Sequence, residues 1–165
     1  MSGVRETAAG ITLSGGGVAA WRAQDLNIDT TFLRRCIKSL EVAFDEVQRR
    51  GTDDILYDIY RAACVKEFEL VLEQSGKLLR KRLAEFFASN RQADKLVFKD
   101  LFRHAARHAL IEPDRVERWL LYRDHRNDTA HKYGEDFAEA TLVLLPDFIA
   151  DATDLAAALE AGNDG

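Results

Sequence analysis

The stretch LRRCIKSLEVAFDEV, residues 33–47, decides the fold class of this chain of 165 residues. Its apolar positions recur every three or four residues, which is the spacing that one face of an α-helix requires. These positions are Leu33, Cys36, Ile37, Leu40, Phe44 and Val47. Asp29, Thr30 and Thr31 precede the stretch and are residue types that cap the beginning of a helix. Gly51 follows the stretch, so the pattern predicts a helix that ends before this glycine.

A longer helix is predicted over residues 54–88, where helical spacing resumes after Gly51. Ser75 and Gly76 lie inside it, and such a pair of small residues permits a bend or the close approach of another helix. The apolar stripe expected to face inward is Ile55, Ile59, Ala62, Phe68, Leu72, Leu79, Leu83 and Phe86.

Three more helices are predicted towards the C-terminus. We expect one over residues 97–110, one that begins with Pro113 in its first turn, and one over residues 135–159, which Pro146 should bend. No segment of useful length alternates apolar and polar residues, as a strand would. The sequence therefore predicts an all-α fold, an antiparallel up-and-down bundle of about five helices.

The composition fits one folded domain. Hydrophobic residues make up 47% and charged residues 31% of the chain, unlike a disordered or membrane-spanning protein. We expect residues 1–28, rich in Gly, Ala, Ser and Thr, to form a flexible extension, and residues 29–162 to form a single domain. Because no secretory signal opens the chain and no CxxC pair occurs, we expect a cytoplasmic protein with Cys36 and Cys64 reduced and buried.

Charge is distributed unevenly along the chain, although the net charge is only −5. Residues 77–132 hold 14 Lys and Arg against 8 Asp and Glu, whereas residues 133–165 hold 8 Asp and Glu and no Lys or Arg. A basic segment is what a phosphate-binding surface needs. The charge pattern alone fits ordinary solvated helix faces equally well.

The helix after Pro113 has an inward stripe that ends in polar groups. Its apolar positions are Val116, Trp119 and Leu120, and the same face continues to Arg123, Arg126 and Asn127. Because an unpaired buried charge is costly, these groups must reach solvent or be paired in a cleft or a subunit interface.

Residues 122–133 read YRDHRNDTAHKY and contain an R-x4-H-x-Y pattern made by Arg126, His131 and Tyr133. These residue types suit RNA cleavage without a metal, since a histidine can move the 2′-hydroxyl or leaving-group proton and an arginine can stabilise the phosphorane charge. Asn127 could orient a phosphate or hold the arginine, and Tyr133 offers a phenolic oxygen for modification. Spacing alone leaves open a polar helix junction with a surface histidine.

Residues 33–160 resemble the HEPN superfamily, specifically the nucleotidyltransferase substrate-binding proteins that are close to HepT-type toxins. Two blocks carry the resemblance: Asp58-Ile-Tyr-Arg61 with Phe68-Glu69, Glu73 and Lys77, and Leu110-Ile-Glu with Trp119, Arg126-Asn127, His131 and Tyr133. The resemblance implies a homodimer whose two motifs line a shared cleft. It also implies RNase activity and a neighbouring small nucleotidyltransferase of the MntA type, which silences the toxin by AMPylating the motif tyrosine.

The resemblance assigns a role to each motif residue and implies neither a metal nor a cofactor. The residues carried over are Arg126 and His131 as catalytic, Asn127 as supporting and Tyr133 as AMPylation acceptor. The resemblance gives Lys132 no role, and the basic residues Arg123 and Lys132 are separately candidate contacts to RNA phosphate. The competing hypothesis is a non-catalytic substrate-binding subunit of a two-component nucleotidyltransferase. A third is a helical scaffold in which the motif is incidental.

Other histidines carry weaker signals. His104 and His108 have a metal-like spacing without a third ligand, so a solvated basic face with Arg103 and Arg107 is the preferred interpretation. His125 flanks the motif arginine and could assist it electrostatically, although an exposed spectator is the preferred interpretation.

Two features of the predicted long helix bear on partners. Glu69, Glu73 and Lys77 repeat every four residues, which indicates a row of ion pairs or, by the resemblance, a partner contact. Gly76 stands where relatives often carry tryptophan, which affects the expected packing and dimer contact there.

Overall fold

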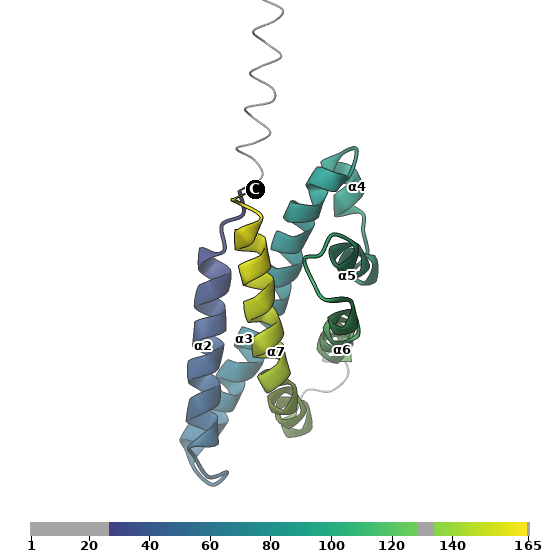
Figure 1. Cartoon of the computed structure of the whole chain (residues 1–165). Helices are drawn as coiled ribbons and strands as arrows, with labels where there is room; N and C mark the ends of the chain where they lie inside the picture. Colours follow the sequence, from purple (N-terminus) through teal and green to yellow (C-terminus); the bar gives the residue numbers. More distant parts are fainter. Residues whose placement is uncertain (1–26, 129–133, 165) are drawn as a thin grey trace, which may run out of the picture.

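The computed structural model describes residues 27–128 and 134–164, and the regular secondary structure within these ranges is entirely helical (Figure 1). The helices are α2 (Thr31–Gln48), α3 (Ile55–Leu83), α4 (Asn90–Asp94), α5 (Phe98–Arg107), α6 (Val116–Asn127) and α7 (Glu135–Ala161), with 3-10 turns η1 (Ala84–Phe86) and η2 (Pro113–Arg115). The predicted all-α bundle is confirmed, and only the short α4 is additional. The predicted flexible extension lies outside the described residues, apart from its last two positions. None of the described helices is both long and apolar enough to cross a membrane.

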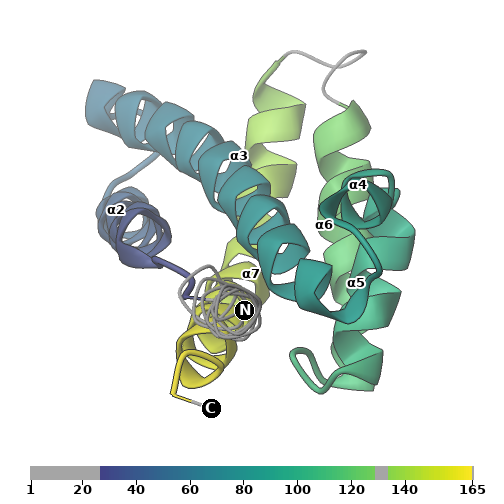
Figure 2. The same cartoon turned by 90° about the horizontal axis from the view of Figure 1, so that it is seen from above.

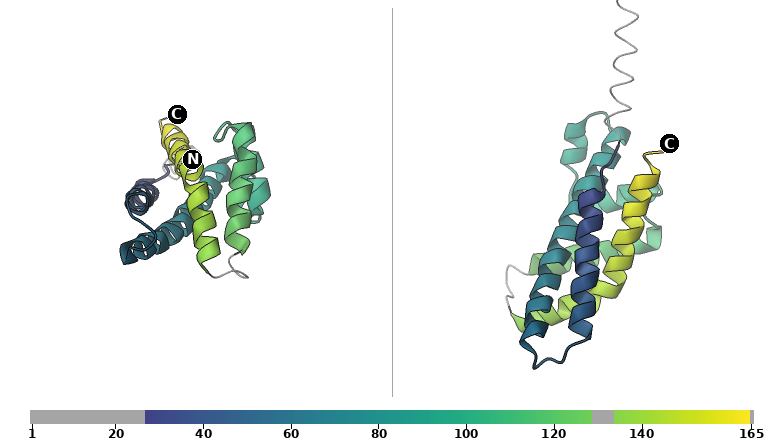
Figure 3. Two further views of the ribbon diagram at one scale, coloured as in Figure 1. Left: turned by 90° about the horizontal axis from the view of Figure 1, so that it is seen from below. Right: turned by 90° about the vertical axis from the view of Figure 1, so that its left-hand side faces the viewer.

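The helices form two groups that share α7. In Figure 1, α2, α3 and the second half of α7 run side by side, and α5 and α6 lie across them. Figures 2 and 3 show the first half of α7 beside α6 and a change of direction part-way along α7. Pro146 lies inside α7 and lacks the N–H that would continue the helical ladder, so the predicted bend is confirmed. The bend lets one helix complete both groups.

Large aromatic side chains join the two groups. Phe68 of α3 lies 4.6 Å from Phe148 of α7, and Phe148 lies 4.9 Å from Tyr122 of α6, measured between ring centroids. Trp119 of α6 stacks on Phe102 of α5 at 4.9 Å. All five side chains are essentially inaccessible to solvent. Each stabilises the fold by roughly 1.5–3 kcal/mol through burial.

Only half of the α3 residues that were predicted to face inward are buried. Phe68, Leu72, Leu79 and Leu83 are buried as predicted, whereas Ile55, Ile59, Ala62 and Phe86 are exposed. At about 100° per residue, the interval from Ile55 to Phe68 places these two residues on nearly opposite sides of one helix. The inward positions near the beginning of α3 are Tyr57 and Cys64 instead.

The small pair within α3 permits close packing of α5. A Cβ added at Gly76 would lie 3.5 Å from the Phe98 ring, while α3 continues as one helix past this point. The predicted close approach is therefore confirmed, and Phe98 occupies the space that a tryptophan at Gly76 would need. Cys36 and Cys64 are buried free thiols as predicted, and burial raises the pKa of Cys64 to about 12.

Polar contacts close the end of the bundle where the chain enters and leaves. The buried guanidinium of Arg82 donates to the Leu159 carbonyl oxygen at 2.9 Å and to the Asn163 side-chain oxygen at 2.6 Å. The same Asn163 oxygen accepts the backbone N–H of Ile28 at 2.8 Å. Because Ile28 is also only 3% exposed, the folded region includes this residue.

Candidate functional site

Helix α6 carries the first part of the R-x4-H-x-Y motif in its last turn. Pro113 opens η2 directly before it, as the sequence indicated, and Val116, Trp119 and Tyr122 form its buried face. Tyr122, not Leu120, is the third fully inward position. Towards the end of the helix the same face continues to Arg123 and Arg126, which are half-buried, so the inward stripe ends in polar groups as the sequence indicated.

Arg123 and Arg126 lie close together at this end of α6. Both side chains are half-buried, and the Arg123 guanidinium lies over the Phe98 ring, 5.0 Å from its centroid. Burial and the positive charge of Arg126 lower the pKa of Arg123. Asn127 follows as an exposed residue at the end of the helix. The structure therefore brings two arginines and an amide to one place.

His131, Lys132 and Tyr133 lie outside the described residues. The segment that contains them connects the end of α6 to the beginning of α7, and the two helices run side by side from this connection (Figure 3). The last turn of α6 contains Arg126 and the first turn of α7 contains Glu135 and Asp136. Each charge type stands at the helix end that its dipole favours.

His125 packs inside this junction, so the expectation of an exposed spectator is wrong. Its ring stacks on Phe137 with centroids 4.4 Å apart, and the edge of Phe68 lies 5.8 Å away. Its Nε2 atom lies 2.8 Å from the Thr141 hydroxyl oxygen. Burial lowers the pKa of His125, which favours the neutral imidazole.

The beginning of α7 is also tied to α3. One carboxylate oxygen of Glu139 accepts the Tyr57 hydroxyl and an Arg61 N–H, each at 2.7 Å. Arg61 also pairs with Asp58 at 3.2 Å. The block Asp58-Ile-Tyr-Arg61 of the sequence thus has a physical role, because it holds the helix that follows the motif segment.

A buried carboxylate fixes α6 to the middle of α7. Asp151 accepts the Tyr122 hydroxyl at 2.6 Å and the Arg118 Nε–H at 2.9 Å, and its side chain is fully buried. Asp151 is not among the site residues predicted from the sequence. An available signal was its place between Phe148 and Leu155, since a charged residue on an apolar face indicates a buried partner.

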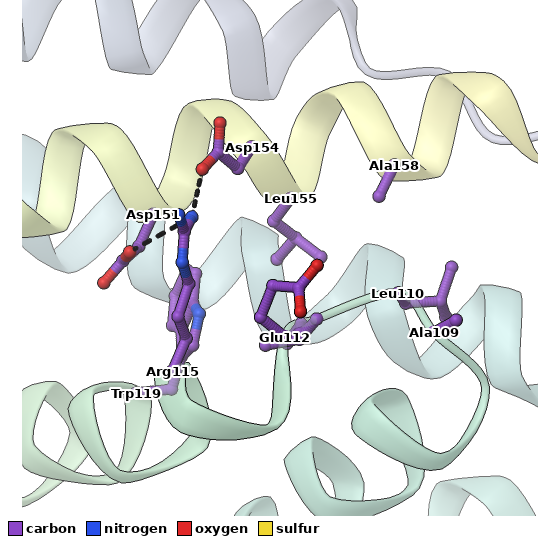
Figure 4. Close-up of a pocket in the computed structure, with 10 residues that line it drawn as sticks. Ala109, Leu110, Glu112, Arg115, Trp119, Asp151, Asp154, Leu155 and Ala158 are labelled. Carbon is purple, nitrogen blue, oxygen red and sulfur yellow. Dashed lines mark hydrogen bonds and ion pairs between the residues drawn. The ribbon is translucent and has the colours of Figure 1, made fainter.

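A pocket of about 240 Å³ lies between the α5–α6 connection and α7 (Figure 4). Within it Arg115 points towards α7, pairs with Asp154, and lies 3.7 Å from Asp151. These residues belong to η2 and α7, at the opposite end of α6 from Arg126. Its central charges pair with one another, and neither Arg126 nor Asn127, the described residues of the motif, lines it.

The other histidine pair packs against η1. His108 stacks on Phe86 with centroids 3.8 Å apart, and His104 meets the edge of Phe87 at 5.2 Å. His108, Arg103 and Arg107 are exposed, as the preferred solvated basic face requires, whereas His104 is half-buried. Among the described residues, no group of three or more potential ligands is arranged to hold a metal ion.

Of the charged row on α3, Glu73 and Lys77 are exposed and Glu69 is half-buried. Contact of this row with a partner stays a prediction.

Comparison with known proteins connects this architecture to a family. The chain matches the model described as "Nucleotidyltransferase substrate binding protein like" over residues 29–161. It is 30% identical over 119 residues to a Haemophilus influenzae protein named "Probable ribonuclease HepT". The matched region covers 70% of this chain and 80% of that protein. It also resembles the solved HI0074 structure from the same organism, described as the fold of a substrate binding domain of a nucleotidyltransferase. That match has a TM-score of 0.69 and 27% identity and covers 79% of this chain and 98% of the other. The chain therefore belongs to the nucleotidyltransferase substrate binding protein family and is a HepT-like HEPN protein.

Proposed function

We propose that this protein is a HepT-like ribonuclease toxin that acts in the cytoplasm as a homodimer and cleaves RNA without a metal ion. Its activity is silenced by a cognate MntA-type nucleotidyltransferase. The proposed site comprises Arg126 and His131 as catalytic residues, Asn127 as a supporting residue, Arg123 and Lys132 as phosphate contacts, and Tyr133 as AMPylation acceptor. The relative named "Probable ribonuclease HepT" supports the reaction class.

The observation that carries the proposal is the proximity of Arg123 and Arg126 at the end of α6. Two half-buried guanidinium groups repel each other, and this repulsion contributes to the lowered pKa of Arg123. Both groups attract anions, and guanidinium groups match the oxygen geometry of phosphate. Exposed Asn127 supplies an amide donor at the same place. This end of α6 therefore has the chemistry of a phosphodiester site.

The proposed reaction needs one proton shuttle and one charge stabiliser. The 2′-oxygen of RNA attacks phosphorus as its proton passes to a general base, and the bond from phosphorus to the 5′-oxygen breaks as that oxygen gains a proton. We assign the proton transfers to His131 and the stabilisation of negative charge on the phosphorane to Arg126. The products are a cyclic phosphate and a 5′-hydroxyl end.

Single-turnover cleavage of a defined RNA by purified variants tests the role of the arginine. We expect Arg126→Ala to reduce the cleavage rate by about 100-fold or more, because a donor to the charged transition state is lost. Arg107→Ala removes an exposed arginine from the end of α5 and serves as the matched control. Equal rates for the two variants would remove Arg126 from the mechanism.

Silencing is tested by coexpression with the neighbouring nucleotidyltransferase. AMPylation joins the Tyr133 phenolic oxygen to the α-phosphorus of ATP and releases pyrophosphate. We expect the protein to gain the mass of one AMP and to lose RNA cleavage, and Tyr133→Phe to gain no such mass. Modification of Tyr133→Phe at the same level would place the acceptor elsewhere.

A second function, a non-catalytic subunit that presents substrate to a nucleotidyltransferase, is favoured by the description of the HI0074 fold. The arginines would then hold a nucleotide phosphate and leave RNA intact. Binding of a labelled nucleotide that depends on Arg126, combined with no RNA cleavage by a folded wild-type protein, would support this function.

A further inference from the structure

His125 stands directly before Arg126 but faces a different environment. Its half-buried ring contacts two other helices, stacking on Phe137 of α7 at 4.4 Å and meeting the edge of Phe68 of α3 at 5.8 Å. The residue therefore links the last turn of α6 to the first turns of α7. It also places both against the aromatic core.

The direction of the hydrogen bond between His125 and Thr141 follows from the threonine. The Thr141 hydroxyl donates its single hydrogen to the Phe137 carbonyl oxygen at 2.9 Å. Its oxygen is then the acceptor for His125 Nε2, which lies 2.8 Å away and must carry the hydrogen. The imidazole thus has a defined tautomer, with Nε2 protonated.

Asp151 and Glu139 give the described part of α7 further polar contacts at other places. Asp151 binds Arg118 and Tyr122, one or more turns before the end of α6, and Glu139 binds residues of α3. His125 and Thr141 supply a polar bond between α6 and α7 right beside the motif arginine. This bond has a defined direction, which the apolar contacts between the two helices lack.

We propose that His125 is a positioning residue, which orients the last turn of α6, and thereby Arg126 and Asn127, by donating a hydrogen bond to Thr141 and stacking on Phe137. The expected effect of His125 on RNA cleavage rests on the proposed RNase function. Its expected effect on the rigidity of the two helix ends does not depend on that function. A displacement of about 1 Å at a reacting group costs up to about 100-fold in rate. Loss of the hydrogen bond, which would let Arg126 move, should therefore slow RNA cleavage.

A matched pair at the acceptor tests the proposal. Thr141→Val keeps the shape of the side chain and removes the hydroxyl, whereas Thr141→Ser keeps the hydroxyl and loses a methyl group. We expect Thr141→Val to lower kcat for RNA cleavage by about 10-fold or more with KM within about twofold, since an orienting bond contributes mainly in the transition state. Thr141→Ser should retain most of kcat.

Backbone amide hydrogen exchange of the same proteins provides the readout that is independent of catalysis. We expect faster exchange in residues 123–127 and 135–141 of Thr141→Val than of wild type or Thr141→Ser, because the two helix ends open more readily. Exchange in α2 should not change. This measurement applies even to a wild-type protein that does not cleave RNA, so failure of the proposed function is distinguished from failure of the positioning role.

A second pair covers the case in which Thr141→Val does not fold. His125→Gln keeps an N–H donor near the position of Nε2, and His125→Phe keeps the aromatic stack without a donor. The proposal expects His125→Gln to preserve slow exchange at the helix ends better than His125→Phe. Unchanged exchange and an unchanged kcat in Thr141→Val, or equal behaviour of the two His125 variants, would overturn it.

Discussion

Replacement of Asp151 gives the sharpest stability prediction, because this carboxylate is buried and joins α6 to α7. Its side chain is fully buried and accepts the Tyr122 hydroxyl at 2.6 Å and the Arg118 Nε–H at 2.9 Å. A hydrogen bond to a charged group contributes about 1.5–3 kcal/mol, and breaking a buried ion pair costs about 3–5 kcal/mol. Because the Arg118 side chain is 40% exposed and water can solvate it, the cost lies near the lower bound.

We therefore expect Asp151→Asn to lower the free energy of unfolding by about 3 kcal/mol, a large part of the roughly 5–15 kcal/mol typical of a domain. Urea unfolding followed by circular dichroism at 222 nm measures it, with an unchanged dependence on urea as the sign of two-state behaviour. Asp154→Asn is the matched control. Asp154 lies on the same face of α7 as Asp151, but it is 60% exposed and pairs with Arg115 of η2. A loss for Asp151→Asn no greater than that of the control would refute the reasoning.

Three further perturbations have outcomes that the structure determines. Hydrogen bonds from Arg34 and Thr30 lower the pKa of Glu160 from 4.5 to about 2, so the unfolded chain binds a proton first as the pH falls. Wild type should lose more stability than Glu160→Gln between pH 6 and pH 3 in urea unfolding, and parallel losses would contradict this. Burial lowers the pKa of His125 below 6.5, so its contribution to stability falls as the pH decreases below about 6.5, and His125→Phe should show a weaker dependence between pH 7.5 and 5.5. Gly76→Ala should raise the unfolding temperature, since helix propensity gains up to about 1 kcal/mol and the added Cβ meets Phe98 at an ordinary 3.5 Å, whereas Gly76→Trp should lower it. A lower unfolding temperature for Gly76→Ala would show that the α3–α5 contact has no room.

The helices were predictable because their signal is local. Apolar spacing, caps and the two prolines lie within a few residues of the structure that they determine, and α2, α5, α6 and α7 appear near the expected positions. The error in α3 arose where an apolar side chain was equated with an inward one. Ile55 is 69% and Ile59 56% exposed, because the inward face of this long helix is defined by the helices packed against it.

For the candidate site, the sequence predicts which residues belong to it but not how they are arranged. The motif and the family resemblance singled out Arg126 and Asn127, and the structure places them at the end of α6 beside Arg123. The positions of His125 and Asp151 were not predictable, because their partners lie 16 and 29 residues away in the chain and meet only in the folded bundle. Polar contacts of this kind depend on the direction of α7, which the bend near Pro146 sets.

Cleavage of defined RNAs by wild type and His131→Ala in excess EDTA, read on a denaturing gel, tests the central claim most directly. We expect wild type to cut RNA to fragments with a cyclic phosphate end, and His131→Ala, folded to the same extent by circular dichroism, not to cut it. If neither protein cuts while both are folded dimers, His131 is not a catalyst, the RNase proposal is contradicted, and the substrate-binding subunit becomes the better description.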